Sequence, residues 1–288
     1  MDTVRGIDEV QQAFLDSLIC ERLTDAEENR VLTRKIRMKR NEGLVDILCS
    51  DESWDRDAAK TTACYVVKTK GKKVLFFFSL RCGELFDRVD DALLDFADEA
   101  YREIYTVAHH LAPSEEEPER AKAYWEKAQQ KGLSLGDLEV LHQKKLLYKS
   151  DIHIETSNEI NRVLNIYPAI ELSLLGVNEE EKEWWQSMGM PRKMGETLFW
   201  HFVVPKLEEI LAHVGCQYLY LFAADQEPDG ALVNYYRVRL FFDIPTALGA
   251  NKPRFDYQCQ FMCQEIPKLI DQRNLFFAHF NADFAQDT

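Results

Sequence analysis

The sequence predicts an α/β (α+β) protein with a mixed central sheet flanked by helices and a helical insertion after the third strand. Three observations support this fold class. Runs of β-branched and aromatic residues occur at 62–67, 74–80, 170–177 and 217–223. Segments with apolar residues at helical spacing flank these runs. In the second half, a strand, a loop, a helix and a strand follow one another, and such a βαβ unit implies neighbouring parallel strands.

Two helices are expected before the first β runs. Apolar residues at helical spacing cover 7–19, and Asp8 can cap the first turn of that helix. A weaker apolar stripe covers 25–40, and a basic cluster at its end is followed by Gly43, which suits a helix C-terminus. The cluster comprises Arg34, Lys35, Arg37, Lys39 and Arg40. We interpret this cluster as a solvated helix face rather than a binding patch.

The runs at 62–67 and 74–80 predict a hairpin, because a short segment rich in Lys, Thr and Gly separates them. The second run is apolar on both faces, so we expect it inside a sheet that helices cover. From about Cys82 to Ser150 the composition becomes charged and helical, which predicts the insertion. Such an insertion fits a specificity lid or an oligomerisation element, for example in a homodimer.

The strand expected at 167–177 contains one carboxylate, Glu171, within an apolar stretch. An acidic loop with two adjacent aromatic residues, Trp184 and Trp185, follows the strand. These two side chains could line an acceptor site, but packing that anchors the loop is the favoured interpretation.

Arg192 and Gly195 lie where this loop turns into a helix expected at 198–214, which Pro205 should bend. Free N–H groups and the helix dipole favour an anion at such a turn, and glycine lets a ligand approach the main chain. No Gly-Lys-Ser/Thr follows, so the turn is not a P-loop. It is a candidate phosphate site, although a plain helix start with a capping turn looks similar.

The charge and cysteine content bound the partners and the compartment. The chain has 35 Lys and Arg against 49 Asp and Glu, a net charge of −14. A nucleic-acid binder should be basic, so we expect no nucleic-acid partner. The short apolar runs and the polar start indicate no membrane partner and no signal peptide. Seven scattered cysteines indicate free thiols in the cytoplasm, and Cys259 with Cys263 lacks the second ligand pair of a zinc site, so no metal is expected.

In this order, the motifs resemble the GNAT superfamily of N-acetyltransferases. The family fingerprint Gln/Arg-x-x-Gly-x-Gly/Ala follows its fourth strand, and residues 192–197 stand in that place. Residues 232–241 resemble the family's Phe-Tyr-x-x-x-Gly-Phe segment, and the opening order of two helices and a hairpin also matches. Two positions depart from the pattern. Thr197 replaces the usual small residue, where it could crowd a pyrophosphate or donate to it, and Leu240 replaces the glycine before Phe241.

The resemblance divides the chain into an N-terminal part of the acetyltransferase domain (1–82), the helical insertion (83–150), an acyl-CoA-binding core (151–265) and a C-terminal extension (266–288). It implies that acetyl-CoA lies in a V between the fourth and fifth strands. We expect these two strands to be adjacent through their C-terminal halves; separate halves would argue against an acetyltransferase, although not against every α/β fold.

The resemblance also implies which main-chain groups hold the cosubstrate. Residues at the turn would hold the pyrophosphate, and residues of the preceding strand would pair with the pantetheine arm. The turn residues are Met190, Arg192, Lys193, Met194, Gly195, Glu196 and Thr197. The strand residues are Leu174, Leu175 and Val177.

Catalysis in this family is direct attack of a neutral amine on the thioester, with both reactants held in place. Glu171 is the candidate base, because burial makes a carboxylate a better proton acceptor and because it lies six residues before Val177, as in some family members. A structural ion pair is the alternative for Glu171. Tyr236 matches the tyrosine that protonates the departing thiolate, with aromatic packing as its alternative.

The implied function is transfer of an acetyl group from acetyl-CoA to an amine of a small molecule, a protein or a peptide. A second hypothesis is a catalytically degenerate GNAT fold that binds acyl-CoA or a protein partner, which the departures at Thr197 and Leu240 suggest. A toxin that acetylates aminoacyl-tRNA is a third hypothesis, which the charge of −14 disfavours.

Overall fold

The computed structural model describes residues 6–39, 42–87, 126, 165–224, 230–251 and 259–282. The chain divides into two compact units, the first made of residues 1–84, 167–245 and 251–288 and the second of residues 85–166 and 246–250. Most of the expected insertion, including the helices predicted in it, lies outside the described residues. The boundaries predicted from the sequence therefore stay predictions.

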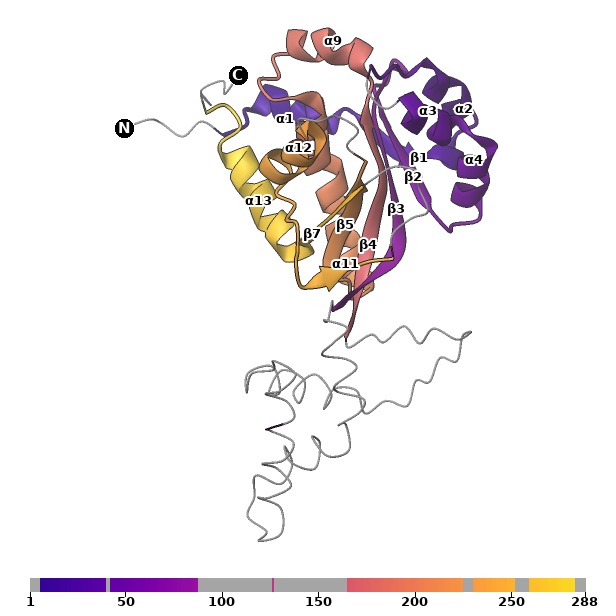
Figure 1. The fold of residues 1–288 in the computed structure, drawn as a ribbon. Helices are drawn as coiled ribbons and strands as arrows, with labels where there is room; N and C mark the ends of the chain where they lie inside the picture. The colour runs from indigo at the N-terminus through magenta and orange to yellow at the C-terminus, as the bar shows by residue number, and fades with distance from the viewer. Residues whose placement is uncertain are drawn as a thin grey trace. The chain divides into compact units, whose positions relative to one another are not determined.

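The described strands form one mixed sheet with the order β1-β2-β3-β4-β5-β7 (Figure 1). They are β1 (Ile19–Arg22), β2 (Ala63–Lys68), β3 (Val74–Asp87), β4 (Ile166–Val177), β5 (Tyr218–Ala223) and β7 (Gln260–Glu265). Strands β1 and β2, β2 and β3, and β5 and β7 pair antiparallel, whereas β4 and β5 pair parallel. In the second unit, the short strand β6 (Leu248–Gly249) pairs with the end of β3. The four predicted strands and the parallel βαβ unit are confirmed.

The described helices lie on both faces of the sheet in the first unit (Figure 1). They are α1 (Glu9–Asp16), α2 (Asn29–Leu32), α3 (Glu42–Cys49), α4 (Asp51–Ala58), α9 (Lys182–Ser187), α10 (Met194–Leu198), α11 (Val204–His213), α12 (Ala231–Arg239) and α13 (Ile266–Ala278). A π-helical turn, η4 (Phe199–Val203), joins α10 to α11. Pro205 follows it in the first turn of α11, where its missing N–H is tolerated, so the predicted 198–214 helix is confirmed with a π turn inside it.

The N-terminal helix begins as predicted but ends earlier. Asp8 caps α1, because its Oδ1 accepts from the Gln11 N–H at 2.8 Å and the Gln11 side chain accepts from the Asp8 N–H. The helix ends at Asp16, and Ile19–Arg22 instead pairs with β2 as β1. This unpredicted strand makes β4 the fourth strand of the sheet.

The single helix predicted at 25–40 is wrong. Only one α-helical turn forms, between the 3₁₀ turns η1 (Leu23–Asp25) and η2 (Thr33–Lys35). Buried polar side chains redirect this segment: Asn29 donates to Glu21, and Thr33 donates back to the Asn29 carbonyl. At Ile36 the backbone becomes extended. The following helices α3 and α4 were not predicted.

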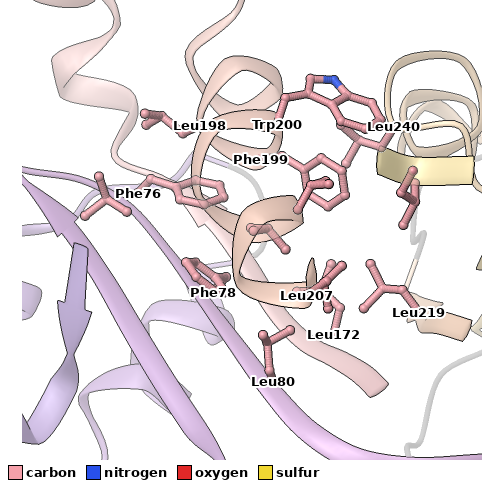
Figure 2. Packing of buried hydrophobic residues seen from close by; sticks show 14 of the residues in the cluster. Phe76, Phe78, Leu80, Leu172, Leu198, Phe199, Trp200, Leu207, Leu219 and Leu240 are labelled. Carbon is pink, nitrogen blue, oxygen red and sulfur yellow. The ribbon is translucent and has the colours of Figure 1, made fainter. Parts of the chain in front are cut away.

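Two apolar clusters lie against the sheet. The larger one fills the space between the sheet and the helix 194–213, where Figure 2 shows Phe76 and Phe78 of β3 facing Leu198 and Phe199. In the smaller cluster, Phe77 packs with residues of the α2–α4 region. Neighbouring β3 residues thus serve both clusters, which confirms that this strand is buried on both faces.

Candidate active site

Strands β4 and β5 pair only at their beginnings. The register joins Ala169–Glu171 to Tyr218–Tyr220, and β4 then runs on to Val177 without a ladder to β5 among the described residues. The expectation of adjacent C-terminal halves is therefore wrong, and so is its use as a criterion for an acetyltransferase, because a ligand can enter between two strands only where they part. The strands separate after Glu171 and Tyr220, and no described strand pairs with β4 at 172–177 on that side. This separation is the V expected between the two strands.

A β-bulge in β4 accompanies the separation. Arg81 pairs with Glu171 across β3 and β4, and the hydroxyls of Ser79 and Ser173 are 2.8 Å apart. If this register continued, Phe77 would lie opposite Leu175. Instead, a β-carbon on Gly176 would meet the Phe77 ring, so the register has shifted by one residue. One extra β4 residue is therefore accommodated between positions 173 and 176.

The bulge changes which β4 side chains face which cluster. Leu172 belongs to the larger cluster and Leu174 to the smaller one, whereas Leu175 and Val177 contact the larger cluster again. The side chains of the three predicted pantetheine residues (Leu174, Leu175 and Val177) are therefore committed to packing, and their main chain lies along the open side of the V.

The predicted phosphate turn is the N-terminus of the helix that starts with α10. Its N-cap is Lys193, whose side chain makes no capping hydrogen bond to the first turn. Gly195 packs tightly: a β-carbon there would lie 2.9 Å from Cγ1 of Val177 and 3.3 Å from Oη of Tyr235. The turn thus presents helix N–H groups beside the end of β4, an arrangement that suits an anion.

Most side chains of the turn point away from any anion. Met190 and Met194 are buried in the larger cluster. Arg192 donates to the carbonyls of Phe280 at 2.9 Å and His279 at 2.5 Å, so its guanidinium caps the end of α13. The main chain of these residues remains the part able to hold a phosphate.

Two further turn residues are buried. The hydroxyl of Thr197 donates to the Lys193 carbonyl at 3.1 Å, so it is used within its own helical turn and faces inward. Burial raises the pKa of Glu196, while the charges of Arg239, Arg192 and Lys193 oppose the rise. Thr197 therefore neither crowds the turn nor donates from it in this structure.

The loop before the turn is anchored by packing. Trp185 is buried, and its indole N–H donates to the Arg192 carbonyl at 2.9 Å. Trp184 is partly buried, with Phe14 against its ring and the Lys73 ammonium above it. The preference for packing over an acceptor-lining role is borne out for both residues.

Glu171 lies at the point where the V opens, in a polar cluster that spans three strands. It is 6% exposed. Arg81 of β3 binds it in a bidentate manner, with Nε 2.9 Å from Oε2 and Nη2 2.9 Å from Oε1. Tyr220 of β5 donates to Oε2 at 3.1 Å, and Glu171 and Tyr220 are the last registered pair of the parallel ladder. The cluster holds the three strands together where β4 and β5 part.

The partners of Glu171 were missed by sequence reasoning. Burial raises the pKa of Tyr220, and the charge and hydrogen bond of Glu171 raise it further, so its phenol keeps its proton. Its ring lies over Gly83, where a β-carbon would be 2.3 Å from its hydroxyl. The available signal was the buried carboxylate itself, because a buried charge needs a partner, and Arg81 is a cation on a neighbouring strand.

Helix α12 brings Tyr235, rather than Tyr236, to the turn. The Tyr235 hydroxyl lies against Gly195, and burial together with the charge of Glu196 raises its pKa. Tyr236 is 9% exposed and packs in the larger cluster, with its ring 6.1 Å from that of Phe242.

The helix also ends one residue later than the motif implies. Phe241 is the left-handed residue, with φ +59°, and the Phe242 N–H closes on the Tyr236 carbonyl at 3.1 Å. Phe241, not Leu240, therefore occupies the conformation that glycine favours. Counted back from Phe241, the tyrosine position of the motif falls on Arg237, so the spacing alone does not select Tyr236.

Within the described part of the chain, no three His, Cys, Asp or Glu side chains are grouped to hold a metal ion. No described helix is long and apolar enough to cross a bilayer. All seven cysteines are free; three are buried, three are intermediate and Cys82 is exposed.

No family model matches the chain, and no curated protein sequence is similar to it. Several solved structures are similar. AtaTR bound with acetyl-CoA is 13% identical over 91% of this chain and 99% of its own, with a TM-score of 0.42. AtaT complexed with acetyl-methionyl-tRNAfMet is 13% identical over 90% of this chain and 99% of its own, with a TM-score of 0.44. A KacTA–DNA complex is 11% identical over 89% and 98%, with a TM-score of 0.43.

These structures contradict one expectation drawn from composition. The net charge of −14 led to the prediction of no nucleic-acid partner and disfavoured an acetyltransferase acting on aminoacyl-tRNA. Two of the similar structures contain tRNA or DNA. The prediction used the net charge of the whole chain, but a partner contacts one surface, whose charge can differ from that of the chain.

Proposed function

We propose that this chain is an acetyl-CoA-dependent N-acetyltransferase of the GNAT type. The observation that carries the proposal is the open V between β4 and β5, beside a helix N-terminus packed closely on Val177 through Gly195. In this proposal, the first-turn N–H groups hold the pyrophosphate. The pantetheine arm adds to the free side of β4 at Leu174, Leu175 and Val177.

The reaction is direct transfer. The acceptor nitrogen forms a bond to the acetyl carbonyl carbon, the C–S bond to CoA breaks, and the amine proton must leave. Glu171 is proposed as the base, directly or through water. Its Oε2 accepts from both Arg81 and Tyr220, whereas its Oε1 accepts only from Arg81 among the described residues and keeps a free lone pair.

The departing thiolate needs a proton or a hydrogen bond. Tyr236 is proposed for this role from the sequence resemblance at 232–241, counted from Leu240, and Tyr235 is the alternative because its hydroxyl lies beside the turn. Both side chains are on α12, so single Phe variants compare the two hydroxyls with little other change.

The degenerate-fold hypothesis was suggested by the sequence departures at Thr197 and Leu240. Thr197 faces into its helix, and Phe241 takes the left-handed conformation in place of a glycine at Leu240. Neither departure blocks the turn.

Two measurements on the whole chain test the proposal. Titration calorimetry with CoA should show binding, and thiol release from acetyl-CoA should appear with an amine acceptor from a library that includes aminoacyl-tRNA. Absence of CoA binding by the folded protein would reject the proposal. CoA binding without thiol release for any acceptor would favour the degenerate fold.

A further inference from the structure

One short segment of this acidic chain is rich in positive charge. Residues 30–40 contain six Arg and Lys and no Asp or Glu, although acidic residues outnumber basic ones 49 to 35 over the whole chain. Arg30 is paired with Asp51 and lies over the Trp54 ring. The remaining described cations, Arg34, Lys35, Arg37 and Lys39, are called the basic segment below.

The basic segment is exposed, and Lys39 is the one of its four side chains whose charge acts on a neighbouring described carboxylate, that of Glu179. All four residues are exposed, and no described carboxylate forms an ion pair with their side chains. The Arg37 guanidinium donates to the carbonyls of Arg34 and Ile36, both at 2.8 Å, which holds the extended backbone but leaves the charge unpaired. Arg34, Lys35 and Arg37 are thus exposed cations without an ion pair to a described carboxylate, and such a cluster on a chain of opposite net charge indicates a surface for an anion.

The segment has a fixed position at the end of β4. The Asn178 side chain accepts from the Arg37 N–H at 3.1 Å and donates to the Val74 carbonyl at 3.1 Å. The Glu179 N–H donates to the Arg37 carbonyl at 2.8 Å, and its carboxylate accepts from the Lys39 N–H. These main-chain contacts hold the basic segment across the end of the strand that borders the V.

The basic segment and the phosphate turn lie on opposite faces of β4. A β-carbon at Gly176 would meet Phe77 and the Met38 sulfur, within the basic segment's own stretch of chain, whereas Val177 contacts Gly195 of the turn. Consecutive residues of a strand face opposite sides of a sheet. A cosubstrate held by the turn would therefore lie on the face of β4 opposite to the basic segment.

We propose, resting on the proposed acetyltransferase function, that the basic segment binds the phosphate backbone of a nucleic acid that carries the acceptor amine. Arg and Lys side chains spaced along an extended segment suit a row of phosphates. The chain outside this segment has an excess of acidic residues, which favours the segment as the place where a polyanion binds. CoA binding should not depend on it, because the turn lies across the strand.

The test is binding of fluorescently labelled tRNA by the full chain, followed by anisotropy between 50 and 200 mM salt. Four phosphate contacts predict a slope of log affinity against log salt of about −3 to −4, which is about a hundredfold loss over this range. Arg34→Gln with Lys35→Gln and Lys39→Gln should remove two to three units of that slope and weaken binding at least about tenfold. Arg37 is kept because its guanidinium supports the backbone.

A matched variant controls for net charge. Arg56→Gln with Lys70→Gln and Lys268→Gln removes three exposed cations elsewhere and should leave tRNA affinity within about twofold. Equal loss in the two triple variants would overturn the proposal, as would no tRNA binding by a protein that binds CoA. Equally tight binding of polyglutamate or anionic lipid vesicles would overturn the assignment to nucleic acid. CoA binding is measured separately from tRNA binding. Absence of CoA binding by the unaltered chain would therefore refute the proposed function rather than the tRNA site alone.

Discussion

Substitution of Gly195 tests the phosphate turn most directly. A β-carbon would lie 2.9 Å from Val177 Cγ1. Non-bonded carbons rest about 3.5–4.0 Å apart, so Gly195→Ala forces a shift of about 0.6–1.1 Å between the turn and β4. A hydrogen bond to a charged group is worth about 1.5–3 kcal/mol, so misaligning one N–H donor should weaken CoA binding by about 1–3 kcal/mol, roughly 5- to 150-fold.

Gly195→Asp separates packing from charge. It places the same β-carbon as alanine and adds a carboxylate, so its affinity for CoA should be lower still, and the part of that extra loss that comes from charge should shrink with added salt. Calorimetry with CoA measures both variants. Gly215→Ala and Gly215→Asp are the controls, because a β-carbon at Gly215 meets no atom within 4 Å. Unchanged CoA affinity in a folded Gly195→Asp protein would refute the phosphate assignment.

Three further predictions concern catalysis and stability. Glu171→Gln keeps the shape of the side chain but cannot take a proton, so turnover measured by thiol release should fall about 10²–10⁴-fold with CoA affinity unchanged; full turnover would leave Glu171 a structural role with Arg81. Tyr236→Phe should lower turnover at constant CoA affinity, whereas Tyr235→Phe should weaken CoA binding because its hydroxyl lies against the turn; the reverse pattern in calorimetry and thiol release would exchange their roles. Burial lowers the pKa of His201 to about 4 in the folded state, whereas its pKa in the unfolded chain is near 6.5. Above pH 6.5 the neutral form keeps its full contribution to stability, and this stability is lost as the pH falls from 6.5 toward 4, because only the unfolded chain binds the proton. Urea unfolding should show about 2 kcal/mol of that loss between pH 7 and pH 5, and His201→Gln should remove it; an unaltered pH dependence in the variant would contradict the assignment.

The elements with one dominant signal were predicted from the sequence. Six of the seven residues at 74–80 are apolar, so a buried strand is the structure that hides them, and the polar Ser79 is buried with them. Asp8 with Gln11 three residues later marks a helix start through local hydrogen bonds alone. The turn at 192–197 was found because a glycine before an amphipathic helix is also a local feature.

Segments whose structure depends on distant partners were predicted wrongly or missed. The stretch 25–40 has a weak helical pattern, but buried Asn29 and the contacts of Arg37 with Asn178 turn most of it into short turns and extended chain. The short strand Ile19–Arg22 forms because β2 offers it a free edge. A one-residue helix shift at Phe241 likewise followed from packing of Phe242 in the core.

The sequence by itself determined the mixed α/β fold class, the order of the strands around the turn and the buried carboxylate Glu171, because these depend on periodicity and on neighbours within one element. Only the tertiary structure decided that Arg81 and Tyr220 meet Glu171, that β4 leaves β5 after that residue, and that the basic segment and the turn face opposite sides of β4. Such arrangements join residues about 100 positions apart, and strand register, a bulge and side-chain direction set them. None of these three is encoded in a local pattern, since each depends on which partner strand lies alongside.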